Sequence, residues 1–269
     1  MQRRHLLAVA LIGTLAGGPW PPLATARAAS APRFDTVVVD AGHGGDDHGA
    51  RGPKGLLEKD LVLDLARRVR AKLAEQSLEV VMTRDADRFV TLEERTRIAN
   101  AASPDLFISI HANASSLQNV TGIETFFASP EATDESARAL AESENLAFGA
   151  SAVRMAEGDP LRAILGDLLA TEHLADAQEF ARMAQRRLAT AESSRSRGVK
   201  QAPFVVLMGV HSPAVLVEVG FLTNAKEESR LASFAERERL VFGLAEAVSV
   251  FRARQDARLG VAENGGGSR

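Results

Sequence analysis

The chain has 269 residues, of which 45% are hydrophobic and 25% charged, a composition typical of a soluble globular protein. The formal net charge of −3, with no Lys/Arg block beyond an ordinary solvated helix face, argues against a nucleic-acid-binding protein. Cysteine is absent, which excludes a disulfide framework and thiolate catalysis.

The N-terminal segment has the three parts of an export signal. Arg3 and Arg4 precede an apolar run over 6–15, and Ala26-Arg27-Ala28 forms a small-x-small cleavage site. The apolar run is shorter than the roughly 20 residues that a membrane-spanning helix needs. We therefore predict a signal peptide over 1–28 and no membrane span in the mature form. The paired arginines also fit a twin-arginine signal loosely.

The next part of the chain alternates strand-like and helix-like stretches. A helix predicted over 58–76 carries an apolar residue at every fourth position from Leu61 to Leu73. A second helix, over 91–101, opens on a capping box at Thr91. Strands are predicted at 34–40, 79–83, 106–111 and 122–128.

The pattern then becomes helical before strands return. Helices are expected at 134–148, 161–169, 172–192 and 227–254, with breaks at 149, 158–160 and 166–171, and strands at 204–208 and 214–219. Residues 255–269 end in a Gly-rich run and are expected to be disordered. Alternating strands and helices predict an α/β protein whose sheet has helices on both faces.

Two histidines each follow an apolar strand. His43 lies in a glycine-rich loop after Val37–Val39, and His111 ends the strand 106–111. In open α/β folds the carboxyl ends of strands carry the site. Two imidazoles and the carboxylate of Glu58 would make a three-ligand zinc set with an open fourth position. The spacing alone does not separate this set from an unrelated scatter of two histidines and a glutamate.

Two carboxylates also stand in or at the end of buried strands. Glu218 interrupts the apolar run 214–219, and burying an unpaired charge costs several kcal/mol. It is either paired with an arginine or functional, and beside a metal-activated water it would accept a proton and pass it to a leaving amine. Asp40 is placed similarly, and we predict that it orients a ligand histidine or a loop amide.

Three segments together resemble a known family. They are 39–45 (Val-Asp-Ala-Gly-His-Gly-Gly) with Glu58, 109–114 (Ser-Ile-His-Ala-Asn-Ala) and 218–224 (Glu-Val-Gly-Phe-Leu-Thr-Asn). In order and separation they are similar to the zinc-dependent N-acetylmuramoyl-L-alanine amidases of the AmiA/AmiC type, the Amidase_3 family. The resemblance covers about residues 34–251. It implies a single α/β domain over 34–254, with a mixed, mainly parallel sheet flanked by helices and a helical insertion.

The resemblance also implies site residues and a substrate. His43, Glu58 and His111 would bind one Zn²⁺, and Glu218 would be the catalytic carboxylate. The substrate would be peptidoglycan, cut in the periplasm at the amide between N-acetylmuramic acid and L-alanine, in cell-wall remodelling or daughter-cell separation.

Division-associated members of this family carry an inserted helical segment that blocks the zinc site until a LytM-type activator displaces it. Residues 137–169 stand where that segment would be. We expect Glu144, or less favourably Glu142, to reach the zinc as a displaceable ligand. We also expect Arg51 or Lys54 to hold stem-peptide carboxylates, the alternative being a solvated loop, and Asn113 to contact substrate.

Two other functions remain open at this point. A zinc peptidase acting within the stem peptide would use similar ligands, and only the family resemblance favours the muramoyl amide. A non-catalytic peptidoglycan-binding protein would have lost a ligand or Glu218, and all four residues are present.

Overall fold

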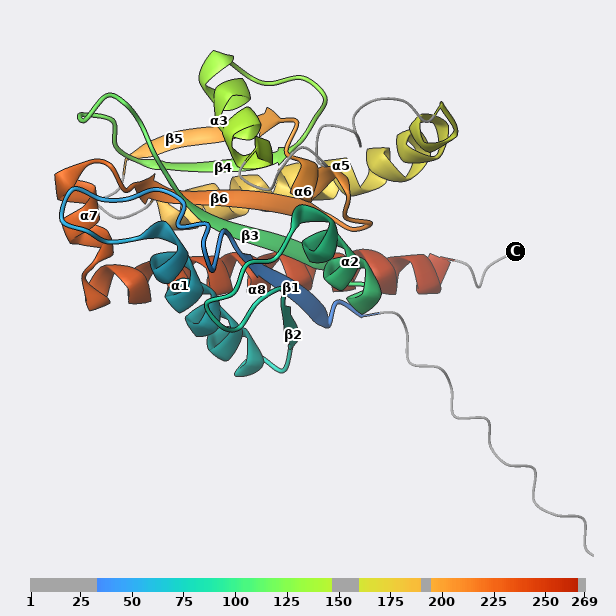
Figure 1. Cartoon of the computed structure of the whole chain (residues 1–269). Coiled ribbons are helices and arrows are strands. Elements are labelled where there is room, and N and C mark those ends of the chain that lie inside the picture. The colour runs from blue at the N-terminus through green and yellow to red at the C-terminus, as the bar shows by residue number, and fades with distance from the viewer. Residues whose placement is uncertain (1–32, 147–159, 190–194, 266–269) are drawn as a thin grey trace, which may run out of the picture. The chain divides into compact units, whose positions relative to one another are not determined.

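The computed structural model describes residues 33–146, 160–189 and 195–265 (Figure 1). The predicted signal peptide over 1–28 and the predicted breaks at 149 and 158–159 lie outside the described residues. None of the described helices is both long and apolar enough to cross a membrane.

A six-stranded sheet organises the described residues, with strand order β2-β1-β3-β6-β4-β5. Its strands are β1 (Thr36–Ala41), β2 (Glu79–Met82), β3 (Leu106–Asn113), β4 (Ile123–Ala128), β5 (Ser196–Ala202) and β6 (Ala214–Phe221). All neighbouring pairs are parallel except β4 with β6, which is antiparallel. The predicted mixed, mainly parallel sheet is confirmed.

Helices pack on both faces of this sheet (Figure 1). They are α1 (Glu58–Ala74), α2 (Leu92–Ala102), α3 (Glu135–Leu146), α5 (Pro160–Leu188), α6 (Val205–Met208), α7 (Ala225–Leu231) and α8 (Phe234–Gly265). Apolar residues of α1, α5 and α8 form the larger core cluster on one face. Residues of α2, α3 and α6 form the smaller cluster on the other.

The face toward α2, α3 and α6 changes from apolar to polar along the strands. Because side chains alternate between faces, Phe107 is followed on this face by Ser109 and His111, and Leu216 by Glu218. The register pairs His111 with Glu218 and Glu124 with Glu218 across neighbouring strands. The polar side chains therefore gather at the C-terminal ends of β1, β3 and β6.

Five details of the predicted secondary structure are wrong. Residues 204–208 contain the short helix α6 rather than a strand, and the fifth strand is β5, which the sequence pattern did not indicate. The expected break at 166–171 is absent because α5 is continuous. The single helix expected over 227–254 is divided into α7 and α8. Finally, α8 extends through Gly265, so residues 255–265 are helical rather than disordered.

Candidate active site

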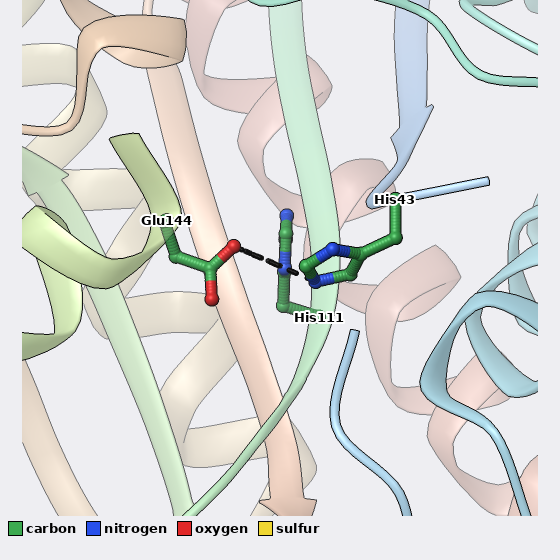
Figure 2. A group of neighbouring side chains, drawn as sticks. All are labelled: His43, His111 and Glu144. Carbon is green, nitrogen blue, oxygen red and sulfur yellow. Dashed lines mark ion pairs between the residues drawn. The ribbon is translucent and has the colours of Figure 1, made fainter. Parts of the chain in front are cut away.

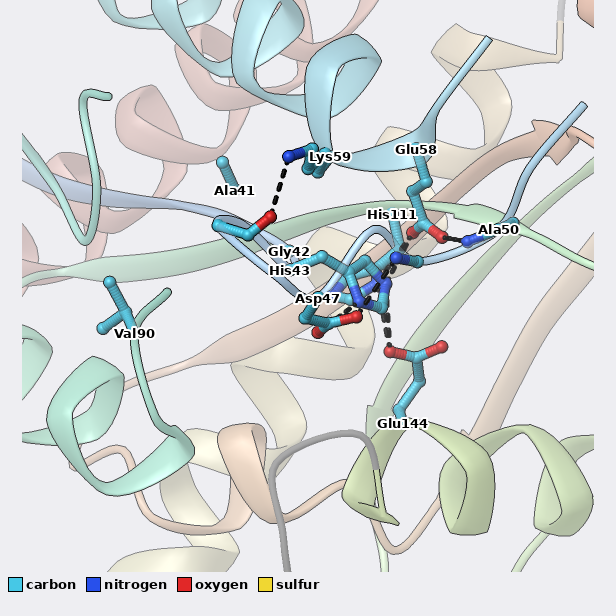
Figure 3. A network of polar contacts seen from close by, with 12 residues as sticks. Ala41, Gly42, His43, Asp47, Ala50, Glu58, Lys59, Val90, His111 and Glu144 are labelled. Carbon is cyan, nitrogen blue, oxygen red and sulfur yellow. Dashed lines mark hydrogen bonds and ion pairs between the residues drawn. The ribbon is translucent and has the colours of Figure 1, made fainter. Parts of the chain in front are cut away.

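His43 lies in the loop after β1 and points toward the end of β3 (Figure 3). Its backbone has φ +57°, a left-handed conformation that is uncommon for a residue with a side chain. The ring atom Nδ1 lies 2.8 Å from Asp47 Oδ2, so Asp47 fixes the orientation of the imidazole. This leaves Nε2 directed at Glu58 and Glu144.

Glu58 begins α1 and connects the two histidines. Its Oε1 lies 3.1 Å from His43 Nε2 and 3.1 Å from His111 Nδ1. Backbone amides of Ala50 and Ala112 donate to its two carboxylate oxygens and hold it in place. The structure thus brings together His43, Glu58 and His111, the three residues predicted as ligands.

A fourth group reaches the same point from α3 (Figure 2). Glu144 Oε2 lies 3.3 Å from His111 Nδ1 and 3.5 Å from His43 Nε2. Ligand atoms of these three residues all lie within 4.8 Å of one another. Glu142, the other candidate on this helix, is exposed. Of the two glutamates considered, Glu144 is the one in contact with the histidines.

The carboxylates around the two imidazoles favour a positive charge at this point. Burial alone would lower the pKa of His43, but the charge of Glu58 and the hydrogen bond with Asp47 raise it to about 11. Burial would raise the pKa of Glu58, yet the neighbouring histidines hold it well below its usual range. Burial raises the pKa of Glu144, with the histidines acting against that shift. The two imidazoles and the two carboxylates thus lie close enough together to surround a single cation.

Glu218 is fully buried beside this cluster. Neither of its carboxylate oxygens has a hydrogen-bond partner among the described residues. Burial raises the pKa of Glu218 well above its ordinary value, and the charge of Glu58 adds to the shift. A buried carboxyl group without a partner in the protein commonly has a catalytic role or binds a water or an ion.

The side chain of Asn113 contacts a neighbouring carboxylate and does not face solvent. It is buried, and its Nδ2 donates to Glu124 Oε2 at 3.2 Å. The other oxygen of Glu124 accepts from Arg197 Nε at 2.8 Å and pairs with Lys200 Nζ at 2.9 Å. The predicted contact of Asn113 with substrate stays a prediction, and in this structure its side chain donates to Glu124.

We predicted that Asp40 would orient a ligand histidine or a loop amide. In the structure its partners are other side chains. Its carboxylate accepts from Thr83 Oγ1 at 2.5 Å, Ser109 Oγ at 2.7 Å and Arg95 at 2.6 Å. Arg95 in turn donates to the carbonyls of Ala41 and His43. Asp40 therefore acts on the His43 loop through Arg95, and the carboxylate that contacts Nδ1 of His43 is Asp47.

Like Arg95, a second buried arginine was not singled out from the sequence. Arg84 is fully buried and donates to the carbonyls of Ala41, Gly42 and Lys59. Arg84 and Arg95 together bind three successive carbonyls, those of residues 41–43. One signal was available, because Arg95 shares the buried stripe of α2 with Leu92 and Ala99.

Two glycines allow the close packing at the site. A Cβ at Gly42 would lie 2.3–2.7 Å from ring atoms of His111. At Gly49, where φ is +62°, a Cβ would lie 2.5 Å from Glu58 Oε2. Any side chain at either position would displace a predicted metal ligand.

Arg51 and Lys54 are exposed on the loop between His43 and Glu58. Lys54 Nζ donates to Ser229 Oγ, and its backbone amide donates to the buried carboxylate of Glu228. Glu228 thus fixes this loop against α7. Their predicted role in holding stem-peptide carboxylates stays a prediction, with a solvated loop as the alternative.

Comparison with known proteins gives a consistent result. Residues 37–250 match the Amidase_3 family, described as N-acetylmuramoyl-L-alanine amidase. The chain is 35% identical over 214 residues to the amidase AmiA of Escherichia coli (strain K12), covering 79% of this chain and 74% of that protein. It is 30% identical over 219 residues to AmiC of Escherichia coli O6:H1, covering 81% of this chain and 52% of that protein.

Solved structures are similar over nearly the same region. An N-acetylmuramoyl-L-alanine amidase from Clostridium difficile 630 has a TM-score of 0.63 and 28% identity, covering 82% of this chain and 97% of that one. The catalytic domain of CwlV from Bacillus (Paenibacillus) polymyxa has a TM-score of 0.61 and 29% identity, with coverage of 81% and 97%.

Proposed function

The chain belongs to the N-acetylmuramoyl-L-alanine amidase family, and from this premise we propose that it is a zinc-dependent, autoinhibited hydrolase of peptidoglycan. The bond cut is the amide between the lactyl group of N-acetylmuramic acid and L-alanine of the stem peptide. One observation carries the proposal: the convergence of His43, Glu58 and His111 beside the unpartnered carboxylate of Glu218.

The donor set fits zinc. Two imidazole nitrogens and a carboxylate are the ligands of catalytic zinc sites. Zinc bonds of about 2.0–2.1 Å in a tetrahedral arrangement separate ligand atoms by roughly 3.3 Å. The nitrogen–oxygen distances within the cluster run from 3.1 to 3.5 Å. When bound, zinc would supply a Lewis acid that activates water and the amide carbonyl.

Glu218 performs the proton transfers in this proposal. Its pKa is raised by burial, which brings a carboxyl group closer to the range useful for acid–base work near neutral pH. As a carboxylate it accepts the proton of the attacking water. As a carboxylic acid it delivers that proton to the alanine nitrogen, so that the amine leaves uncharged. The absence of other hydrogen-bond partners leaves both oxygens available for these steps.

We propose that α3, in the position seen here, closes the active site. Glu144 lies where a fourth ligand would bind, and Asn145 beside it hydrogen-bonds Pro203 and Val205 on the neighbouring segment. A cavity of about 10 Å³ lined by His111 and Glu144 has room for about one water, and Glu144 itself covers the two histidines that the substrate carbonyl must approach. Substrate entry therefore requires α3 to move. By resemblance to division-associated members, a LytM-type activator would displace it.

The cellular setting follows from the same resemblance. An export signal over 1–28, with paired arginines, would send the chain to the periplasm by the twin-arginine route. There it would take part in cell-wall remodelling or daughter-cell separation.

The test is a digest of purified peptidoglycan, with products identified by mass. The Glu144→Gln variant should release stem peptides that begin with L-alanine several-fold faster than the parent chain. Chelator should stop the release, and adding Glu218→Gln should lower it by at least about 100-fold. Zinc content, measured on the same samples, should remain unchanged in the Glu218→Gln variant.

Three other outcomes would contradict parts of the proposal. Products cut within the stem peptide would make the chain a peptidase. Zinc-loaded protein that binds peptidoglycan without releasing products, in both forms, would make it a binding protein. Equal rates for the parent chain and Glu144→Gln would remove the inhibitory role of Glu144 alone.

A further inference from the structure

A second charged cluster lies next to Glu218, on strands β4 and β5. Glu124 is 2% exposed and is the direct cross-strand neighbour of Glu218. Two cations converge on the same oxygen of Glu124, Arg197 at 2.8 Å and Lys200 at 2.9 Å. The reaction derived above uses neither cation.

Among the described residues, a second carboxylate reaches Lys200 from the α3 segment. Lys200 Nζ also lies 3.1 Å from Asp134 Oδ2, and Asp134 accepts the Ala137 amide at the start of α3. Glu124 supplies one negative charge against the two cations, and Asp134 supplies the second. The Lys200 side chain is 11% exposed and Asp134 is 44% exposed, so solvent screens the pair with Asp134 more than the pair with the buried Glu124.

Asp134 and Glu144 belong to the same face of this segment. Ala137 and Ala141 lie between them at helical spacing and are buried against the sheet. The segment therefore carries two carboxylates to the site, one to the histidines and one to Lys200. A displacement of α3 that includes its first turn withdraws both carboxylates and must also free Thr133 from its hydrogen bonds with Gln201 of β5; Glu124 is then left with two cations.

We propose that Lys200, supported by Arg197, binds a carboxylate of the peptide part of the substrate, and that Asp134 occupies this position while α3 is closed. The inference rests on the proposed function and adds the recognition of the stem peptide. The ten residues from Asp134 to Glu144 span about 15 Å of helix. An extended peptide covers that distance in about four or five residues, so a carboxylate within the first few residues beyond the cut bond is in range.

This assignment differs from the loop cations considered first. Arg51 and Lys54 are exposed, whereas Lys200 is largely buried beside the neighbour of the catalytic carboxylate. A desolvated ammonium group with a missing counter-charge discriminates more strongly between a carboxylate and a neutral amide than a solvated one does.

The test uses two substitutions that break the same ion pair from opposite sides. Asp134→Asn and Lys200→Gln are each introduced into the full chain carrying Glu218→Gln, which binds without turnover. Calorimetry then measures the Kd of a soluble muropeptide and of the same muropeptide with its carboxylates converted to amides. Lys200→Gln should weaken binding of the free acid about tenfold and leave binding of the amide unchanged. Asp134→Asn should leave binding of the acid equal or tighter.

Equal changes in Kd for the two variants would overturn the proposal, because the pair would then act only to hold α3. Equal weakening for the acid and the amide would also overturn it. Lys200→Arg keeps the charge and should retain binding, which separates a lost contact from a misfolded chain. Failure of the amidase proposal would be seen in a different experiment, the peptidoglycan digest. There the chain with native Glu218 would release no stem peptides that begin with L-alanine.

Discussion

Two buried arginines determine the backbone of the loop that presents His43. Arg84 and Arg95 donate to the three successive carbonyls of residues 41–43. A left-handed φ at a residue with a side chain costs free energy, and it persists only where surrounding contacts hold it. The guanidinium groups provide those contacts, so the direction of the His43 imidazole depends on residues distant in sequence.

Replacing Arg95 with lysine should weaken zinc binding. Lysine has a single ammonium group and cannot span Asp40, Ala41 and the His43 carbonyl as the planar guanidinium does. Groups that orient a metal ligand typically contribute 10–100-fold to metal affinity, so we expect a zinc Kd raised by about tenfold or more. Competition with a chromophoric chelator measures that Kd.

The matched control for Arg95 is Arg97→Lys on the same helix. Arg97 is exposed and pairs only with Glu94 one turn away, so its replacement should leave zinc affinity unchanged. A lower melting temperature for Arg95→Lys with an unaltered zinc Kd would mean that Arg95 supports the fold without positioning His43.

The residues around the histidines were harder to predict than the histidines themselves. His43 and His111 stand out because each ends an apolar strand. Asp47 was not singled out because it lies in a loop rich in charge, and Asp40 received the role that Asp47 has. Which carboxylate meets which histidine depends on how the loop turns at His43, and nothing in the strand pattern encodes that turn.

At the level of elements, α3 is held on the site by modest contacts. Of the α3 side chains that pack on the smaller core, Ala137 and Ala141 are small and buried, and Leu140 is only partly buried. Near its C-terminal end, Asn145 donates to the Pro203 carbonyl and accepts the Val205 amide. A segment held by small apolar contacts and a few polar ones suits an element that must leave the site.

Replacing Asn145 with alanine should therefore raise basal activity. Each of its two hydrogen bonds contributes about 1 kcal/mol, so their loss should shift the closed–open equilibrium by about ten- to thirtyfold toward the open state. Release of dye from labelled peptidoglycan measures the rate. Glu142→Ala, at an exposed position of the same helix, is the control and should behave as the parent does. Parent-like rates for both variants would argue against Asn145 as a latch.

The strand that sequence patterning missed carries the second charged cluster. β5 has the sequence Ser-Arg-Gly-Val-Lys-Gln-Ala and lies at the edge of the sheet. Lys200 and Arg197 face Glu124, so the strand has no apolar alternation to detect. By contrast, the run 204–208 is apolar and β-branched, yet it folds as the one-turn helix α6, whose Val206 and Leu207 fill the smaller core. Tertiary packing decides both cases.

For the molecule as a whole, Asp40 joins segments that are far apart in sequence. From β1 it reaches Thr83 after β2, Arg95 on α2 and Ser109 on β3. Apart from β5, the strands themselves were predictable from their apolar runs. Their order and this polar link were not, because neither leaves a periodic signal in any one segment. The link connects the sheet to the helix that supports the His43 loop.

Asp40→Asn should destabilise the chain at neutral pH and much less in acid. Burial alone would raise the pKa of Asp40, but Arg95 and the two hydroxyl donors hold it below its usual range. A lowered folded pKa means that the ionised carboxylate stabilises the fold above about pH 3.9, its unfolded value. That stabilisation is lost as the pH falls toward the folded pKa. Breaking a buried pair from one side costs about 3–5 kcal/mol.

Urea unfolding of both proteins at pH 7 and at about pH 3 measures this difference in free energy. It should be largest at pH 7 and shrink in acid, because the unfolded chain, in which this carboxyl group titrates at about 3.9, takes up a proton that the folded carboxylate resists. Asp64→Asn is the control. Asp64 also has a lowered pKa, but its side chain is 31% exposed and its partners Arg68 and Arg237 are near the surface. Its loss should cost less than about 1 kcal/mol. A pH-independent difference for Asp40→Asn would mean that its hydrogen bonds to Thr83 and Ser109, rather than its charge, carry the stabilisation.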